Sequence, residues 1–144
     1  IYLGSKEGLY RIDRNSSEWK EFADSSSKSF VELKQSAITK VSGFDYDESI
    51  SSMQITADNV LAVSTPKRIW FKDLSSGKIS EISVWDGLPF IPLKGYSNGD
   101  KFDVKDYGTH YMAPVKSVFF DSKNSKYWIV TSYGIASVDR DRLF

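Results

Sequence analysis

The residues that could do chemistry in this chain are few. His110 is the only histidine and the sequence contains no cysteine, which excludes disulfides, zinc–thiolate sites and cysteine nucleophiles. A serine–histidine–aspartate site would depend on His110, and no Gly-x-Ser-x-Gly motif accompanies it. We therefore predict that the chain is not an enzyme, and we interpret His110 as an exposed polar residue of a loop.

Acidic residues give no convincing metal site. Asp100, Asp103 and Asp106 recur every three residues, whereas a calcium loop places its oxygen ligands at tighter, alternating spacing and closes with a glutamate. The acidic group at 45–48 is no closer to that pattern. The sequence predicts neither a metal nor a cofactor.

Aromatic residues form the better candidate site. The segment 86–114 is long and aromatic, and it joins two runs that we expect to be strands. Long loops held by rigid strands often carry function, and rings with a few polar neighbours bind polar organic ligands or peptides. We predict ligand-stacking roles for Trp85, Tyr96, Tyr107 and Tyr111.

Composition limits the class of protein. The chain has 144 residues, which fits one domain, and its 19 basic residues balance 19 acidic ones. This balance gives no electrostatic footprint for nucleic acid. No apolar run approaches the roughly 18 residues that cross a bilayer, so we expect no direct membrane insertion. Aromatic residues make up 15% of the chain, and together with many Val, Ile and Thr residues they favour strands.

One phrase repeats three times along the chain. It reads IYLGSKEGLYRID at 1–13, LAVSTPKRIWFKD at 61–73 and YWIVTSYGIASVD at 127–139. Each copy has an extended apolar run and a hydroxyl residue, then an apolar residue four positions later and an aspartate eight positions later. The hydroxyl residues are Ser5, Thr65 and Thr131, and the aspartates are Asp13, Asp73 and Asp139. We interpret the aspartates as turn initiators that bond the backbone following them.

Each copy is predicted to be a hairpin within a four-stranded antiparallel meander. The predicted strands cover 1–4, 9–13, 51–56, 60–65, 69–73, 79–84, 115–120, 127–131 and 135–139. We also expect a strand at 16–23 to close the first meander. The tryptophans of these strands, Trp19, Trp70 and Trp128, are expected to pack between sheets.

Repeated four-stranded meanders joined by long links are typical of β-propeller blades. The sequence therefore predicts an all-β fold with blade repeats near 1–23, 49–85 and 115–144, and with long linkers at 24–48 and 86–114. These repeats amount to about two and a half blades, and a propeller needs about four to close. We expect residues 1–144 to be a single segment of an incomplete propeller, which would be prone to aggregation when expressed alone.

The repeat resembles the two-component regulator propeller repeat. The phrase IYLGSKEGLYRID carries the resemblance, and WDGLP at Trp85–Pro89 is similar to the family's link between blades. The resemblance implies a non-catalytic sensor domain in the periplasmic half of a hybrid histidine kinase, often dimeric. It also implies that a glycan fragment or another small ligand is recognised.

The first 75 residues are also similar to the citron-homology domain, through the strand pair of the first copy and the segment ITKVSGFDYDESISSMQITADNVLAVSTPKRIWFKDL. That resemblance implies a cytoplasmic propeller whose partner is a protein. WDGLP and the third copy of the phrase favour the first family.

Overall fold

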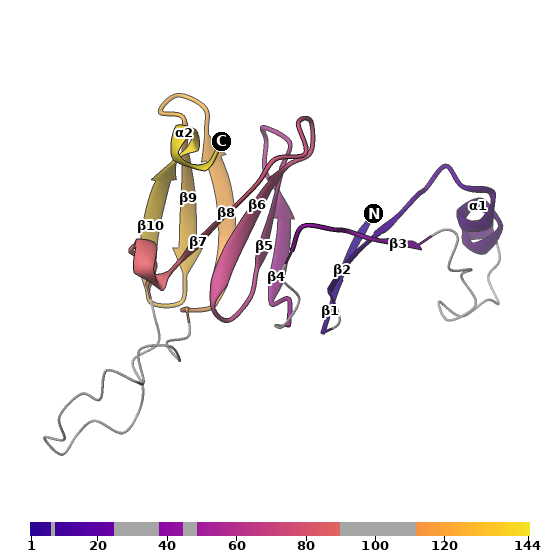
Figure 1. The fold of residues 1–144 in the computed structure, drawn as a ribbon, viewed down its shortest axis with the longest axis horizontal. Helices are drawn as coiled ribbons and strands as arrows, with labels where there is room; N and C mark the ends of the chain where they lie inside the picture. Colours follow the sequence, from indigo (N-terminus) through magenta and orange to yellow (C-terminus); the bar gives the residue numbers. More distant parts are fainter. Residues whose placement is uncertain (7, 25–37, 45–48, 90–111) are drawn as a thin grey trace, which may run out of the picture. The chain divides into compact units, whose positions relative to one another are not determined.

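The computed structural model shows an all-β chain in two compact units, Ile1–Ser49 and Ile50–Phe144. It describes every residue except 7, 25–37, 45–48 and 90–111. The described residues form ten strands in three antiparallel sheets (Figure 1). The predicted fold class is therefore confirmed at the level of all-β structure built from antiparallel sheets.

The first unit contains a three-stranded sheet and one helix. Strands β1 (Tyr2–Ser5), β2 (Gly8–Ile12) and β3 (Ile38–Lys40) pair in the order β1-β2-β3. Helix α1 (Ser17–Asp24) follows β2. The strands predicted at 1–4 and 9–13 are thus confirmed to within one residue.

The prediction of a strand at 16–23 is wrong, because this segment forms α1. The Ser16 hydroxyl oxygen accepts a hydrogen bond from the backbone N–H of Trp19 at 3.1 Å, which satisfies one of the N–H groups that a first helical turn leaves unpaired. Trp19 packs from this helix against the buried Ile12. The strand that completes this sheet is β3, inside the segment expected to be a linker.

The second unit contains two sheets. The four-stranded sheet consists of β4 (Ser52–Ile55), β5 (Val60–Ser64), β6 (Arg68–Asp73) and β7 (Ile79–Ser83), paired in chain order. It is the complete meander that the sequence predicts between 51 and 84. Residues on both of its faces are buried, including Phe71 on one face and Val63 on the other.

The three-stranded sheet consists of β8 (Val115–Asp121), β9 (Lys126–Thr131) and β10 (Gly134–Asp139), again paired in chain order. Two short helices accompany the sheets. The 3-10 helix η3 (Val84–Asp86) follows β7, and α2 (Arg140–Leu143) follows β10. Every strand predicted in the second unit is therefore present, with its ends shifted by at most one residue.

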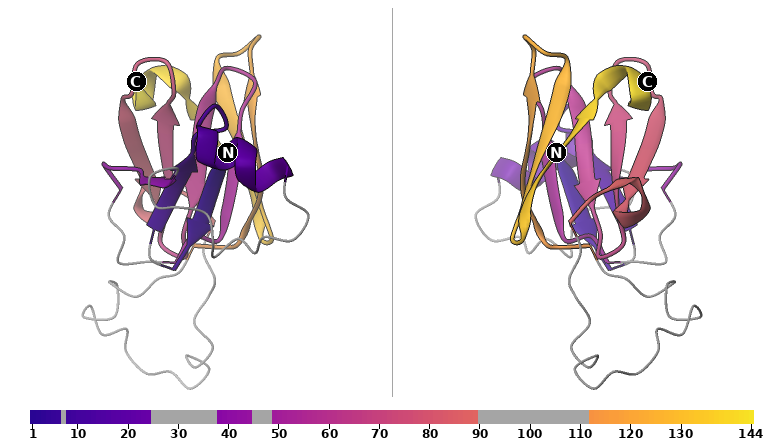
Figure 2. Two further views of the ribbon diagram at one scale, coloured as in Figure 1. Left: turned by 90° about the vertical axis from the view of Figure 1, so that its right-hand side faces the viewer. Right: turned by 90° about the vertical axis from the view of Figure 1, so that its left-hand side faces the viewer.

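The two sheets of the second unit lie against each other and share one hydrophobic core (Figure 2). Phe71 from β6 contacts Tyr127 from β9, with ring centroids 5.1 Å apart. The other buried members include Val60, Ala62, Ile69, Ile82, Leu88, Met112, Val115, Val118, Ile129 and Leu143. Burial of these side chains, at about 25 cal/mol per Å² of apolar surface, is the main force that holds the sheets together.

The repeated hydroxyl residues close the hairpins. Each one donates a hydrogen bond to the carbonyl oxygen three residues later, at 3.1, 3.2 and 2.8 Å in the first, second and third copies. The pairs are Ser5 with Gly8, Thr65 with Arg68, and Thr131 with Gly134. The spacing in the repeated phrase is thus a requirement of the turn.

The repeated aspartates behave as predicted in two copies of three. The side chains of Asp13 and Asp73 accept hydrogen bonds from the backbone N–H two residues later, at 2.9 and 2.8 Å. In Asp73 a second backbone N–H, from Ser76, is the main cause that lowers the pKa of the carboxyl group. Asp139 instead precedes α2 and pairs with Lys126 at 3.3 Å.

A polar network joins the two sheets at one end. The Tyr127 hydroxyl donates to the Asp58 carboxylate at 2.5 Å, and the Arg140 Nε donates to the same oxygen at 3.2 Å. Arg140 also reaches Asp73 at 3.3 Å. Burial raises the pKa of the Tyr127 hydroxyl well above its usual value, and the hydrogen bond to Asp58 adds to this effect. These groups provide hydrogen-bond partners for one another, so we assign the network a structural role.

Candidate functional site

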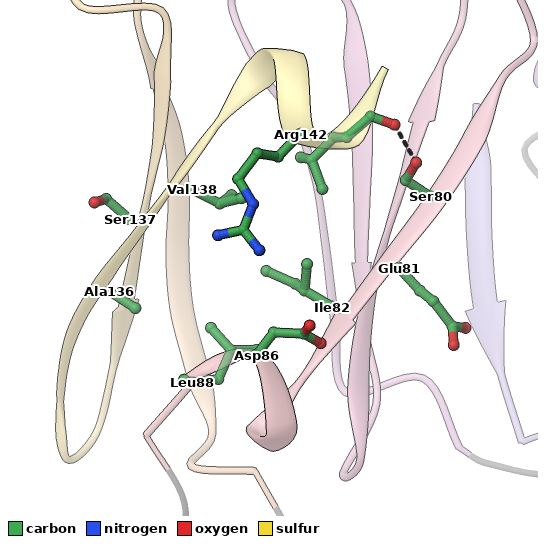
Figure 3. A pocket seen from close by; sticks show the side chains of 11 residues that line it. Ser80, Glu81, Ile82, Asp86, Leu88, Ala136, Ser137, Val138 and Arg142 are labelled. Atoms are coloured by element: carbon green, nitrogen blue, oxygen red, sulfur yellow. Dashed lines mark hydrogen bonds between the residues drawn. The ribbon is translucent and has the colours of Figure 1, made fainter.

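A cavity of about 160 Å³ opens between β7 of one sheet and β10 of the other (Figure 3). Its apolar lining consists of Ile82, Leu88, Ala136, Val138 and Leu143. Its polar and remaining lining consists of Ser80, Glu81, Asp86, Gly87, Ser137 and Arg142. Most of its exposed lining is polar, and it is smaller than the roughly 300–1,000 Å³ of usual small-molecule sites.

Arg142 brings the main charge into this cavity. Its guanidinium group points inward from α2, above Ile82 (Figure 3). The adjoining Leu143 is buried, and its carbonyl oxygen accepts a hydrogen bond from the Ser80 hydroxyl, which anchors α2 to β7. Among the described residues, no hydrogen bond or ion pair engages the Arg142 side chain. The backbone next to Arg142 is therefore anchored, while the donors of its exposed guanidinium are available.

Asp86 lies at the other end of the cavity and has a different role. Its carboxylate accepts a hydrogen bond from the Ser83 N–H at 2.9 Å and another from the Ser83 hydroxyl at 3.2 Å. The Ser83 hydroxyl oxygen in turn accepts from the Trp85 N–H at 3.3 Å. This reciprocal arrangement is a capping box, so Asp86 chiefly fixes the shape of η3.

Trp85 is presented to solvent by this rigid turn. Its side chain is 66% exposed. Gly87 ends the turn at a φ of 95°, a left-handed conformation that a glycine adopts without strain. Since the turn is fixed on both sides, the indole ring can meet a ligand without much loss of backbone entropy.

The structure places only part of the predicted aromatic site. Trp85 is exposed and precedes Asp86 in the chain, but it is not one of the residues that line the cavity. Tyr96, Tyr107 and Tyr111 lie outside the described residues, as do His110 and the aspartates at 100–106. Their predicted roles remain predictions.

The sequence reasoning missed Arg142 and the cavity itself. Ser80 and Ser137 line the cavity from strands far apart in the chain, and Arg142 comes from a helix of only four residues. No local motif marks these positions. The repeated phrase makes β6 and β10 equivalent, and it is the one sequence signal that relates the two sheets lining the cavity.

The described residues offer few groups that could hold a metal ion. No group of three histidine, cysteine, aspartate or glutamate side chains gathers in the part of the chain that the structure describes. The cavity offers a guanidinium, hydroxyl groups and apolar side chains, which are groups that can contact a ligand. In the same described part, no helix has the length and apolar character needed to span a membrane.

Comparison with known proteins gives no match to a family model, a curated protein or a solved structure. The resemblance to propeller repeats thus depends on the short motifs quoted above.

Proposed function

We propose that this chain is a non-catalytic, ligand-sensing segment of a β-propeller of the two-component regulator kind. Each sheet would be one blade, which gives about two and a half blades. The face-to-face packing of the two sheets in the second unit supports this proposal, as does burial on both faces of the four-stranded sheet. Successive blades of a propeller pack in this way.

The observation that carries the sensing role is the exposed indole of Trp85 on its capped turn. A tryptophan offers a large apolar face and a polar N–H, and it loses little conformational entropy on binding. We propose a glycan fragment or another small polar ligand as the molecule that stacks on it. In this proposal the segment belongs to a periplasmic sensor, and the parent protein is a homodimer.

A second candidate function is protein binding of the citron-homology type, in the cytoplasm. The outer face of the three-stranded sheet supports it, because Phe119 is 47% exposed and Ile135 is 66% exposed. Exposed apolar residues that gather on one face often mark a protein interface. In the first proposal, another blade would cover this face.

Ligand titration by calorimetry tests the first proposal. The full chain is titrated with a panel of oligosaccharides and small polar metabolites, and the best binder is measured again with Trp85→Ala. We expect the variant to lose roughly 1–3 kcal/mol of binding free energy, by analogy with stacking of bases on aromatic rings. The melting temperature should stay nearly unchanged, since the indole is exposed.

Phe119→Ala is the matched control, because it removes another exposed ring on a different face of the molecule. It should leave the affinity for the small ligand unchanged. Equal losses from both variants, or full affinity in Trp85→Ala, would reject the sensing site at Trp85. Loss of a protein partner in Phe119→Ala alone would favour the second candidate.

A further inference from the structure

A second, smaller cavity lies between the first strands of the two sheets in the second unit. It has a volume of about 40 Å³, and residues of β4 and β8 form most of its wall. Its lining consists of Ser52, Met53, Gln54, Ala62, Ser64, Ile69, Val115, Lys116, Ser117 and Val118. A molecule of liquid water takes up about 30 Å³, so the cavity admits a group of a few heavy atoms but not a whole sugar ring.

Gln54 forms one side of this cavity, and its side-chain amide has a defined orientation. The Oε1 atom accepts a hydrogen bond from the Val118 N–H at 3.0 Å and another from the Ser117 hydroxyl at 3.3 Å. Only the oxygen of an amide side chain accepts hydrogen bonds, so the other branch is the NH₂ group with its two donors. Among the described residues, no acceptor engages that NH₂ group.

Lys116 is the extra residue of a β-bulge in β8. Val115 lies opposite Thr131 of β9, and Ser117 lies opposite Val130, so Lys116 has no counterpart on β9. A bulge redirects a side chain, and bulges are common next to functional sites. Lys116 is exposed and lines the cavity, and its ammonium group has no ion-pair partner in the part of the chain that the structure describes.

Hydroxyl groups make up the rest of the polar lining. Ser64 is only 2% exposed, and its Oγ lies 2.5 Å from the Oγ of Ser52. None of the residues that line the cavity is acidic. The cavity therefore combines an amide NH₂ group, an ammonium group and hydroxyls, and this donor-rich set with one positive charge favours an anion with oxygen acceptors.

We propose that this cavity binds the carboxylate group of a small organic acid. One carboxylate oxygen accepts a hydrogen bond from the Gln54 NH₂ group, and the other pairs with the Lys116 ammonium group. A planar carboxylate needs less room than a tetrahedral phosphate or sulfate, and the rest of the acid extends to solvent past these two exposed residues. This inference goes beyond the sensing function, because it uses none of the residues around Trp85.

A titration followed by NMR tests the proposal on the isotope-labelled full chain. Sodium acetate is added at neutral pH and constant ionic strength, and the signals of the Val118 N–H, the Ser117 N–H and the Gln54 NH₂ group are followed. We expect these signals to shift in a saturable way. Acetamide is a neutral molecule of the same size and shape, and it should leave them in place.

Lys116→Gln removes the charge from the cavity. We expect it to weaken acetate binding about tenfold, because a charge-assisted hydrogen bond is lost. Lys123→Gln is the matched control, since Lys123 is an exposed lysine in the turn between β8 and β9 and the change in net charge is the same. It should leave the acetate affinity unchanged. Equal weakening by the two variants would show a general effect of charge and would overturn the proposal.

Gln54→Glu gives a second, independent variant. It keeps an oxygen that accepts from the Val118 N–H and the Ser117 hydroxyl, so the contact between β4 and β8 is retained. It replaces the two donors by a carboxylate that repels the ligand, so acetate binding should be lost while the NMR spectrum remains that of a folded chain. Full acetate affinity in this variant would contradict the proposal.

Two results of the first titration would also overturn it. If acetate shifts none of the three signals, the cavity holds water only. If acetate and acetamide shift them equally, the cavity accepts polar groups without preference for a negative charge.

Discussion

The two sheets of the second unit contain the same repeated phrase in two different environments. Ile69 on β6 is completely buried, and its counterpart Ile135 on β10 is 66% exposed. Phe71 is also completely buried, and its counterpart Ser137 is exposed. The difference arises because the β8–β10 sheet covers Ile69 and Phe71, while no described element covers the same face of the β8–β10 sheet.

The two copies separate the properties that the repeated sequence determines from those that the neighbouring sheet determines. The hydroxyl residue closes the hairpin in both copies, and the strands pair in the same register. Stability, however, follows the apolar area that is removed from water. The equivalent positions of the two copies should therefore contribute very unequally to folding.

The largest difference should appear between Ile69→Ala and Ile135→Ala. Truncating the buried Ile69 creates a cavity in the shared core and should cost about 2–5 kcal/mol of unfolding free energy. The same change at Ile135 should stay within about 0.5 kcal/mol. Urea unfolding followed by tryptophan fluorescence measures both. A large loss at Ile135 would show that its face is covered in solution and that the two copies do not differ in burial.

A smaller difference should separate two equivalent turn residues, Asp58 and Asn124. The Asp58 carboxylate accepts hydrogen bonds from the Tyr127 hydroxyl and from Arg140, whereas the Asn124 side chain, within the described part of the chain, bonds to Asp121 in its own exposed turn. Asp58→Ala leaves a buried hydroxyl without its acceptor, so we expect it to cost about 1–3 kcal/mol. Asn124→Ala should cost under about 1 kcal/mol. Equal costs in the same urea experiment would mean that the network does not bind the sheets together.

The smallest effect concerns alkaline pH. The pKa of the Tyr127 hydroxyl is raised in the folded chain, chiefly by burial. The folded state therefore holds this proton more tightly than the unfolded state does. The resulting stability is fully present below the ordinary tyrosine pKa of about 10, and it is lost as pH rises from there toward the raised folded value.

Thermal melting between neutral pH and pH values above about 10 checks this linkage. Tyr127→Phe should reduce the alkaline loss of stability while lowering stability modestly at neutral pH, because Asp58 loses a donor. An alkaline profile identical to that of the original chain would show that Tyr127 is not its source.

The sequence by itself determined nine of the ten strands that the structure describes, all but β3. Alternating apolar residues, the hydroxyl that closes each turn and the fixed distance to the aspartate are local properties, and they predicted nine strands to within about a residue. The segment 16–23 shows where local reasoning failed, because its aromatic residues fit a strand, while the Ser16 hydroxyl caps a helix. A hydrogen bond of this kind leaves only a weak pattern in the sequence. It nevertheless stabilises the first turn of the helix.

Only the tertiary structure decided which of the equivalent residues are buried and where a site forms. Arg142 belongs to no sequence motif. It becomes a candidate binding residue because Ser80 of β7 anchors α2 beside the cavity. Asp58 and Tyr127 are 69 positions apart, and the packing of two sheets brings them into hydrogen-bonding distance. Such contacts depend on the summed burial of a whole sheet face. A local pattern encodes the strand and the side of it that is apolar, but it does not encode what comes to lie against that side.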